Sequence, residues 1–332
     1  MRQLSVLFVL GSMSTGALAS YELAMYTTSN GAIARYDPVN RVSLGTFGSG
    51  LTGWYSNNFV TKDASRPGEV AVLNADGFNR WINYSTGVLK GQFDTRETPY
   101  YGNGPMNHTA LSNGNYLITG YGGAVPSQKT RLMTNTGVVL STLSPFGATY
   151  VPLSATQGTD GNIYQLIRRD NGGGFFNFYS FVYNSIGTYL GFNDLGVESD
   201  QYAYGNVVAT NGRVYYSSSA NTSTLYFKSQ ANGTAQSMTG LTNYSYTVTT
   251  GWTNMAVGHN GNLHLIQSYW NGTNYTNKWY TYDRLANVMA PTHNLPTTDY
   301  AGSLTMVIAP EPGTWGALAL GSLVLMRRRR RA

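Results

Sequence analysis

Apolar and polar residues alternate in short runs along most of the chain, and tight turns separate one run from the next. Asn-Gly or Asp-Gly turns recur at Gly114, Gly161, Gly212 and Gly261, and a Pro-Gly turn lies at Gly68. Each is followed by an alternating segment, such as NYLIT, NIYQLI or NLHLI. Alternation with a period of two is typical of half-buried β-strands, and these dipeptides are typical of hairpin turns. The body of the chain is therefore predicted to be all-β.

The turns also repeat along the chain. The glycines at 68, 114, 161, 212 and 261 are 46, 47, 51 and 49 residues apart. A further short strand precedes each turn, and a second hairpin follows it, for example RLMTNTGVVLSTL. A unit of four short strands with this period is typical of a propeller blade.

The two ends of the body complement each other. Residues 21–47 supply the last three strands of a unit, whereas residues 300–308 supply a first strand with nothing after it. Together they would complete a sixth unit, so we predict a six-bladed β-propeller of four-stranded blades, closed by N- and C-terminal strands. A two-sheet sandwich and a β-solenoid are the alternatives. The complementary ends favour the ring, because closure hides a sheet edge that would otherwise invite aggregation.

The N-terminus has the features of a secretory signal peptide. Met1 and Arg2 precede the apolar stretch LSVLFVLGS, and the small residues Ala17 and Ala19 follow it. A charged start, a short apolar core and a small-x-small site predict cleavage after Ala19. Residues 1–19 are thus assigned to the signal peptide and residues 20–308 to the propeller.

The C-terminal residues 309–332 combine three features in a fixed order. The triplet Pro310-Glu311-Pro312 comes first, and an apolar stretch of 12 residues, Trp315 to Met326, follows it. As a helix this stretch would be about 18 Å long, short of a ~30 Å hydrocarbon core, although arginines at its end extend its reach. We expect a short transmembrane helix that ends at the arginine cluster Arg327, Arg328, Arg329, Arg330 and Arg331.

This triplet, short helix and basic tail resemble the PEP-CTERM sorting signal of bacterial exported proteins. The resemblance implies recognition and cleavage by an exosortase-type membrane peptidase in a Gram-negative envelope. It also implies transient anchoring in the membrane, then release to the cell surface or extracellular matrix, often in association with exopolysaccharide. An ordinary single-span tail anchor is the alternative. The resemblance is confined to the tail and carries no information about what the propeller does.

The net positive charge of the chain is carried by its two ends. The formal net charge is +6, but Arg2 and the five terminal arginines account for all of it, leaving 15 basic and 15 acidic residues. Because the body is neutral, nucleic-acid binding through a basic patch loses its main support, and no nucleic-acid partner is expected. The chain has no cysteine, so disulfides do not stabilise it. Its four histidines lack the spacing of metal ligands, and no cofactor motif occurs.

Long loops on one face of the predicted ring carry the candidate binding residues. These loops are rich in aromatic and uncharged polar residues, which stack on sugar faces and hydrogen-bond sugar hydroxyls. Core packing between blades is the competing explanation for any one of these rings. The candidates are Tyr269, Trp270, Tyr275, Tyr121, Phe175 and Phe176.

Acidic residues collect in the same loops. The candidates are Asp94, Glu97, Asp194 and Glu198. Paired carboxylates serve as acid and base or nucleophile in glycosidases, or bind Ca²⁺. We therefore weigh three functions: a non-catalytic module that binds polysaccharide or another envelope partner, a polysaccharide hydrolase or lyase, and a purely structural matrix protein. Binding without catalysis is the preferred hypothesis.

Overall fold

All the regular structure that can be described is β-strand. The computed structural model describes residues 20–28, 31–48, 59–74, 76–96, 105–120, 129–143, 149–198, 208–210, 213–217, 224–229, 236–239, 251–283, 288–289, 293–297 and 301–310. Within these ranges the chain forms no helix that is long and apolar enough to cross a membrane. The all-β prediction is confirmed, whereas the predicted signal peptide and C-terminal helix lie outside the described residues.

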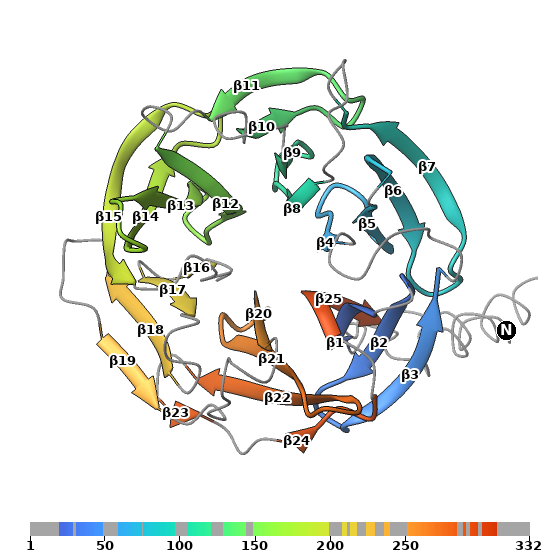
Figure 1. Ribbon diagram of the computed structural model, residues 1–332. Coiled ribbons are helices and arrows are strands. Elements are labelled where there is room, and N and C mark those ends of the chain that lie inside the picture. The colour runs from blue at the N-terminus through green and yellow to red at the C-terminus, as the bar shows by residue number, and fades with distance from the viewer. Residues whose placement is uncertain are drawn as a thin grey trace, which may run out of the picture.

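The strands form sheets that surround a common axis (Figure 1). The first sheet has the order β25 (Ala301–Pro310), β1 (Ser20–Thr28), β2 (Ile33–Asp37) and β3 (Val42–Phe47). The second consists of β4 (Phe59–Lys62), β5 (Glu69–Leu73), β6 (Phe78–Asn83) and β7 (Leu89–Asp94). The third consists of β8 (Pro105–Ala110), β9 (Tyr116–Gly120), β10 (Lys129–Met133) and β11 (Val139–Leu143).

Three more sheets complete the circuit. One consists of β12 (Tyr150–Gln157), β13 (Ile163–Asp170), β14 (Phe176–Tyr183) and β15 (Tyr189–Glu198). The next consists of β16 (Val208–Thr210), β17 (Arg213–Ser217), β18 (Thr224–Ser229) and β19 (Gln236–Thr239). The last consists of β20 (Gly251–Val257), β21 (Leu263–Trp270), β22 (Tyr275–Asp283) and β23 (Val288–Met289), with β24 (His293–Asn294) also paired to β22. Among the described strands, five sheets thus have four antiparallel strands, which gives a propeller-like fold.

The two ends of the body pair with each other, as the sequence predicts. β1 runs antiparallel to β25, with Ser20 opposite Pro310 and Met25 opposite Thr305. Without β25, the inner edge of β1 would expose unpaired backbone groups. The terminal strands therefore close the ring within one sheet.

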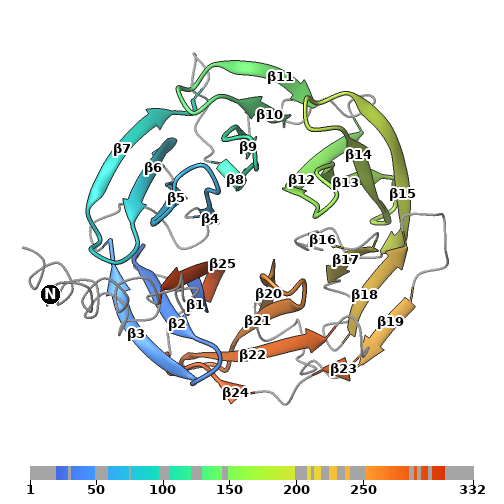
Figure 2. The ribbon, with the colours of Figure 1, turned by 180° about the vertical axis from the view of Figure 1, so that it is seen from behind.

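The antiparallel order gives the ring two different faces. We call turn face the end that carries the connections from first to second and from third to fourth strand of each sheet. We call loop face the opposite end, which carries the hairpins from second to third strand and the connections between sheets. Figure 2 shows the ring from behind, with β25, β4, β8, β12, β16 and β20 again nearest the axis.

The predicted turns on the turn face have the expected geometry. In the turn between β8 and β9, Gly114 N–H donates to the carbonyl of Leu111 at 3.0 Å, and Leu111 N–H donates to Asn115 at 2.8 Å. Gly114 has a φ of 82°, and Gly161 and Gly261 adopt nearly the same value in the equivalent turns. This left-handed conformation favours glycine, which explains why these turns end in Asn-Gly or Asp-Gly.

The hydrophobic core lies between neighbouring sheets. In one cluster Leu73 and Trp81 of the second sheet pack with Tyr116 and Ile118 of the third. Another cluster joins the last sheet to the first through Trp279, Tyr26, Tyr36 and Leu304 among others. Because each cluster needs residues from two sheets, no single sheet buries its apolar face alone.

Side chains of the innermost strands link one sheet to the next. Ser303 Oγ lies 3.2 Å from both the amide nitrogen and the carbonyl oxygen of Val60, and Lys62 N–H donates to Thr305 Oγ1 at 3.0 Å. The next two junctions use the same kind of contact, through Thr61 to Ala110 and through Asn107 and Thr109 to Ala155. These contacts satisfy backbone groups that face the axis, where no further strand is available.

Candidate functional site

An aromatic pair lies at the tip of the hairpin between β21 and β22 on the loop face. Trp270 and Tyr275 are cross-strand partners, and their ring centroids lie 5.1 Å apart in an edge-to-face arrangement. Asn271 shapes the turn between them, because its side-chain oxygen accepts the N–H groups of Thr273 and Asn274 at 3.0 and 2.9 Å. Both rings are half-buried, as is the predicted neighbour Tyr269. The sequence therefore brings two of its predicted binding residues into contact at a solvent-facing tip.

Another predicted pair lies in the equivalent hairpin between β13 and β14. Phe175 is 53% exposed, whereas Phe176 is 6% exposed, with the guanidinium of Arg168 4.7 Å above its ring. Only Phe175 thus presents its ring to solvent here. The sheet β16–β19 lies between this hairpin and the one that bears Trp270, so the two hairpins are separate features of the loop face (Figure 1).

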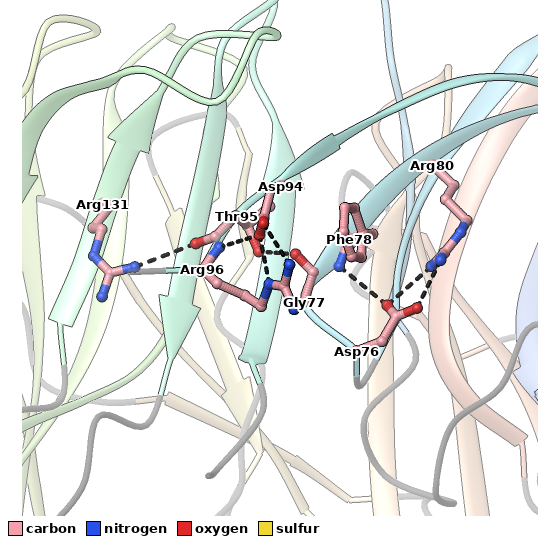
Figure 3. A network of polar contacts seen from close by, with 8 residues as sticks. All are labelled: Asp76, Gly77, Phe78, Arg80, Asp94, Thr95, Arg96 and Arg131. Atoms are coloured by element: carbon pink, nitrogen blue, oxygen red, sulfur yellow. Dashed lines mark hydrogen bonds and ion pairs between the residues drawn. The ribbon is translucent and has the colours of Figure 1, made fainter. Parts of the chain in front are cut away.

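Asp94, a candidate catalytic residue, is held by an arginine (Figure 3). Arg96 donates from Nε to Asp94 Oδ1 at 2.8 Å and from Nη2 to Oδ2 at 2.6 Å, and its backbone N–H also bonds Oδ1. Hydrogen bonding to the Arg96 side chain keeps the pKa of Asp94 below its usual value. The carboxylate is therefore ionised at neutral pH and is a poor proton donor.

Contacts around Asp94 hold the loop that follows β7, Thr95 and Arg96, against the hairpin between β5 and β6. Thr95 donates from both N and Oγ1 to the carbonyl of Gly77, at 2.9 and 2.6 Å, and its own carbonyl accepts from Arg131. A second bidentate pair, Arg80 with Asp76, lies beside it, at 3.0 and 2.6 Å. Figure 3 shows how these pairs hold the loop in place. The network pairs each of the two described carboxylates, Asp76 and Asp94, with an arginine.

The other acidic candidates are not brought to Asp94. Asp194 lies in β15, where its Oδ1 accepts the N–H of Gly196 at 2.8 Å. The whole sheet β8–β11 separates β7, which ends at Asp94, from β15 (Figure 1). Among the described residues no group of three or more His, Asp or Glu side chains has a metal-binding arrangement. Asp94 and Asp194 therefore do not form a carboxylate pair.

The remaining predicted residues fall outside what can be described. Pro310 ends β25 and Glu198 ends β15, but their side chains are not among those described. The other residues in question are Glu97, Tyr121, Ala17, Ala19, Glu311, Pro312 and Arg327 to Arg331.

A cavity that the sequence analysis did not anticipate lies on the axis of the ring. It has a volume of about 350 Å³ and is formed by β4, β8, β12, β20 and β25. Its wall includes Ala64 and Ser112, which belong to turns of the turn face, so the cavity lies toward that face. The only signal in the sequence was the recurrence of hydroxyl and amide residues in the innermost strands, as in FVTK, MNHTA and SATQ.

A buried polar cluster supports one wall of this cavity. Tyr116 donates to the carboxylate of Asp63 and accepts from Trp81 Nε1 at 2.6 Å. His108, in the cavity wall, stacks on the Tyr116 ring with centroids 5.6 Å apart and planes only 2° from parallel. Burial lowers the pKa of His108 to about 3, so the imidazole is neutral. The spacing of the histidines gave no indication of this stacking, because it places His108 of β8 on Tyr116 of β9, which in turn bonds Asp63 in a turn of the preceding sheet.

The comparisons with known proteins bear on the fold alone. No protein-family profile matches the sequence, and no curated protein matches it. A solved structure that is similar is a protein of unknown function from Bacteroides caccae. The TM-score is 0.54 at 13% identity, with 87% of this chain and 99% of the other chain covered. This likeness supports the propeller fold.

Proposed function

We propose that the protein is an exported six-bladed β-propeller that binds polysaccharide or another envelope component without catalysis. The sheet β20–β23 would be a blade like the other five, with β24 as an addition at its outer edge. The observation that carries the binding function is the half-exposed pair of Trp270 and Tyr275 at a hairpin tip. Flat aromatic surfaces in a polar, neutral loop are suited to sugar faces.

Two positions along the chain support the proposed processing. β1 begins at Ser20, directly after the expected signal-peptide cleavage site at Ala19. β25 ends at Pro310, where the predicted sorting signal begins. An exosortase-type peptidase could thus act on a tail that follows the folded body. We propose export across the inner membrane, transient anchoring by residues 309–332, and a final location at the cell surface or outside the cell.

The paired state of Asp94 supports binding over catalysis. A polysaccharide hydrolase needs two carboxylates around one glycosidic bond, one of them protonated. Asp94 is ionised by its contact with Arg96, and Asp194 lies on a different sheet. Neither of these two residues meets that requirement, so the hydrolase or lyase is the less favoured function.

The experiment uses the full chain with a panel of acidic and neutral polysaccharides. Co-sedimentation and newly released sugar ends are measured in the same samples. We expect saturable sedimentation without new ends, and we expect Trp270→Ala to weaken it by roughly 30-fold, equivalent to about 2 kcal/mol. Phe192→Ala is the matched control, since Phe192 is 52% exposed on β15 at the perimeter.

The other outcomes identify the alternatives. New sugar ends would establish the hydrolase or lyase and overturn the proposal. If no polysaccharide in the panel binds saturably, the structural matrix protein becomes the favoured hypothesis. Equal loss in Trp270→Ala and Phe192→Ala would show that binding does not use the hairpin tip.

A further inference from the structure

Four neighbouring hairpins of the turn face carry an apolar side chain at their tips. They connect third to fourth strands and comprise residues 37–42, 83–90, 134–140 and 184–190. The exposed fractions of the tip residues are 75% for Val39, 52% for Val88, 57% for Val138 and 71% for Ile186. Turn tips usually carry glycine, proline or polar residues. A single exposed apolar side chain is ordinary, but recurrence at four equivalent positions indicates a shared role.

Formed turns hold these tips in place. Asp37 Oδ1 accepts the backbone N–H groups of Val39 and Asn40, each at 2.9 Å. In the last of the four hairpins Asn184 Oδ1 accepts the N–H of Ile186 at 3.2 Å. Because the turn backbone is fixed by its first side chain, the apolar side chain at the tip is presented to solvent by the fold itself.

The apolar surface continues onto the outer strands. β3, β7, β11 and β15 follow one another along the perimeter in Figure 1, and the residues that begin them lie beside the tips. We call apolar rim the exposed set Val39, Val42, Val88, Leu89, Val138, Val139, Leu140, Ile186, Tyr189 and Leu190. Exposed apolar residues gathered in this way mark a surface that contacts a partner.

The exposed charges within the four hairpins are all positive. Arg41 follows the first tip and Lys90 follows Leu89, and both are exposed. Asp37, the one acidic residue in these hairpins, is 7% exposed and is bonded to its own turn. Apolar side chains flanked by exposed cations suit the headgroup layer of a membrane, where acyl chains lie beneath negatively charged phosphates.

The chain leaves the propeller from this same face. β25 ends at Pro310, which lies opposite Ser20, the first residue of β1. Since β1 leads to β2 through a loop-face connection, both residues lie at the turn face. Trp315, which begins the apolar stretch of the proposed anchor, follows Pro310 by five residues. Five extended residues span at most about 18 Å. An anchored chain therefore keeps the turn face close to the membrane.

We propose that the turn face of the anchored protein lies on the membrane, with the apolar rim inserted into the headgroup layer of the lipid. This inference rests on the anchoring described under the proposed function. The loop face, with Trp270 at its hairpin tip, would then point away from the membrane. Anchor and rim would together supply two attachments, whereas the rim alone supplies a single reversible one, so cleavage of the tail would release the propeller.

The test places one full chain in each lipid nanodisc of phosphatidylcholine and phosphatidylglycerol. The sequence has no cysteine, so one introduced cysteine takes a fluorescent label at a chosen position, and nitroxide groups on the acyl chains quench labels that enter the lipid. Val138→Cys reports on the rim, and Thr273→Cys, exposed at a loop-face tip, is the control. We expect quenching at the rim at least about threefold stronger, because interfacial elements insert roughly 5–10 Å. Equally weak quenching at the two positions would overturn the proposal.

A third label separates this inference from the anchoring on which it rests. Ser322→Cys places the label within the apolar stretch of the tail. Quenching there but not at Val138→Cys would leave the anchor intact and overturn the membrane contact of the turn face. Quenching at neither position would overturn both. Quenching at Val138→Cys alone would support the rim as a lipid-binding surface and contradict the anchor.

Paired substitutions test the rim in the Val138→Cys chain. Val88→Asp with Ile186→Asp places two acids at tips, and we expect quenching to fall by at least about twofold, because insertion depends on buried apolar area and on attraction to anionic lipid. Thr142→Asp with Phe192→Asp is the matched control, since both residues are exposed farther along the outer strands. Both variants should melt like the parent. Unchanged quenching in the first variant would contradict the proposal.

Two further outcomes are defined in advance. Should the double variant of the tips fail to fold, Val39→Asp takes its place with the same expectation, since Val39 is the most exposed tip. A second copy of the chain is the competing partner for the rim. A label at Val138→Cys that is shielded from aqueous iodide only in vesicles holding many copies, without nitroxide quenching, would indicate that second copy and overturn the lipid assignment.

Discussion

The middle strands and the outermost strands of the sheets differ sharply in burial. In β5 every residue from Val70 to Leu73 is buried, whereas in β3 every residue from Val42 to Thr46 is exposed. β7 and β11 have the same burial pattern as β3, because β7 buries only Phe93 and β11 buries only Leu143. The difference shows that buried apolar side chains lie in the middle strands of the sheets, while β3, β7 and β11 each attach through one apolar side chain.

The outer strands still form an organised layer. They follow one another around the perimeter in Figure 1. The turns that lead into β7, β11 and β15 lie against β3, β7 and β11, respectively. At Gly137, before β11, a Cβ atom would lie 2.8 Å from the carbonyl oxygen of Asp94 at the end of β7. Many outer side chains are apolar and exposed, namely Val42, Leu44, Leu89, Val139, Leu140, Leu190 and Phe192. These edges therefore contribute to the surface of the protein more than to its core.

Truncation of matched leucines gives the largest expected contrast. Leu73 on β5 is fully buried, and Leu140 on β11 is 52% exposed. We expect Leu73→Ala to lower the free energy of unfolding by about 2–5 kcal/mol, because it leaves a cavity. Leu140→Ala should change it by no more than about 0.5 kcal/mol. Urea unfolding followed by tryptophan fluorescence measures both, and equal losses would show that the two layers are equally important.

Removal of one inter-sheet contact has an intermediate effect. Thr305→Val keeps the shape of the side chain but leaves the backbone N–H of Lys62 without its acceptor at 3.0 Å. The expected loss is about 1 kcal/mol in the same unfolding experiment. Thr142→Val on β11, where the residue is exposed, is the control and should be neutral. If Thr305→Val leaves the free energy of unfolding unchanged, water replaces the hydroxyl group at no cost.

A pH-dependent contribution is expected where the ring closes. Glu22 on β1 accepts from the N–H of His259, and its Oε2 lies 3.4 Å from His264 Nε2, in and after the turn that follows β20. Hydrogen bonding to the His264 side chain lowers the pKa of Glu22 below its ordinary value of 4.5. The stabilisation is therefore complete above about pH 4.5 and is lost as the pH falls through the lower folded pKa.

Glu22→Gln checks this assignment. The variant should lose the part of the acid dependence of unfolding that lies below about pH 4.5, and it should be less stable than the parent at pH 7. Asp94→Asn is the comparison, because Asp94 and Arg96 form an exposed pair at the end of an outer strand and should contribute less. Parallel pH profiles for Glu22→Gln and the parent would contradict a role for Glu22 in closure.

The smallest effect on stability is expected at the perimeter. Leu140→Lys and Leu190→Lys replace exposed apolar side chains on β11 and β15. Each should leave the free energy of unfolding within about 0.5 kcal/mol of the parent value. Static light scattering should show less self-association, since charged residues at a sheet edge oppose strand pairing between copies. A loss of stability like that of Leu73→Ala would show that these residues are core.

The strands and turns were predictable because their signals are local. Alternation over five residues indicated β9 and β13, and the Asn-Gly and Asp-Gly turns placed the hairpins before them. The pairing of the terminal strands also followed, since one end lacked the strand that the other supplied. At the candidate site, sequence alone placed Trp270 and Tyr275 in one loop, and the structure brings them into contact as cross-strand partners beside a short turn.

Other parts of the site could not be predicted, because they depend on which side chain of one sheet faces the next. Asp94 was a candidate acid until the position of Arg96 showed it to be paired. Phe175 and Phe176 are adjacent, but only packing against Arg168 decides which of the two is buried. The axial cavity needs strands from five sheets, so the hydroxyl and amide residues of any one innermost strand do not reveal it.

The sequence by itself determined where the strands and turns lie, how the ends of the body complement each other, and the features of the terminal segments. Only the tertiary structure decided that Ser303 bonds Val60 across a separation of 243 residues, and that His108 is buried at the axis without a partner. The physical reason is the range of each interaction along the chain. Hydrophobic alternation and turn conformations act between near neighbours in the chain, whereas contacts between sheets exist only after the sheets have taken their places around the ring.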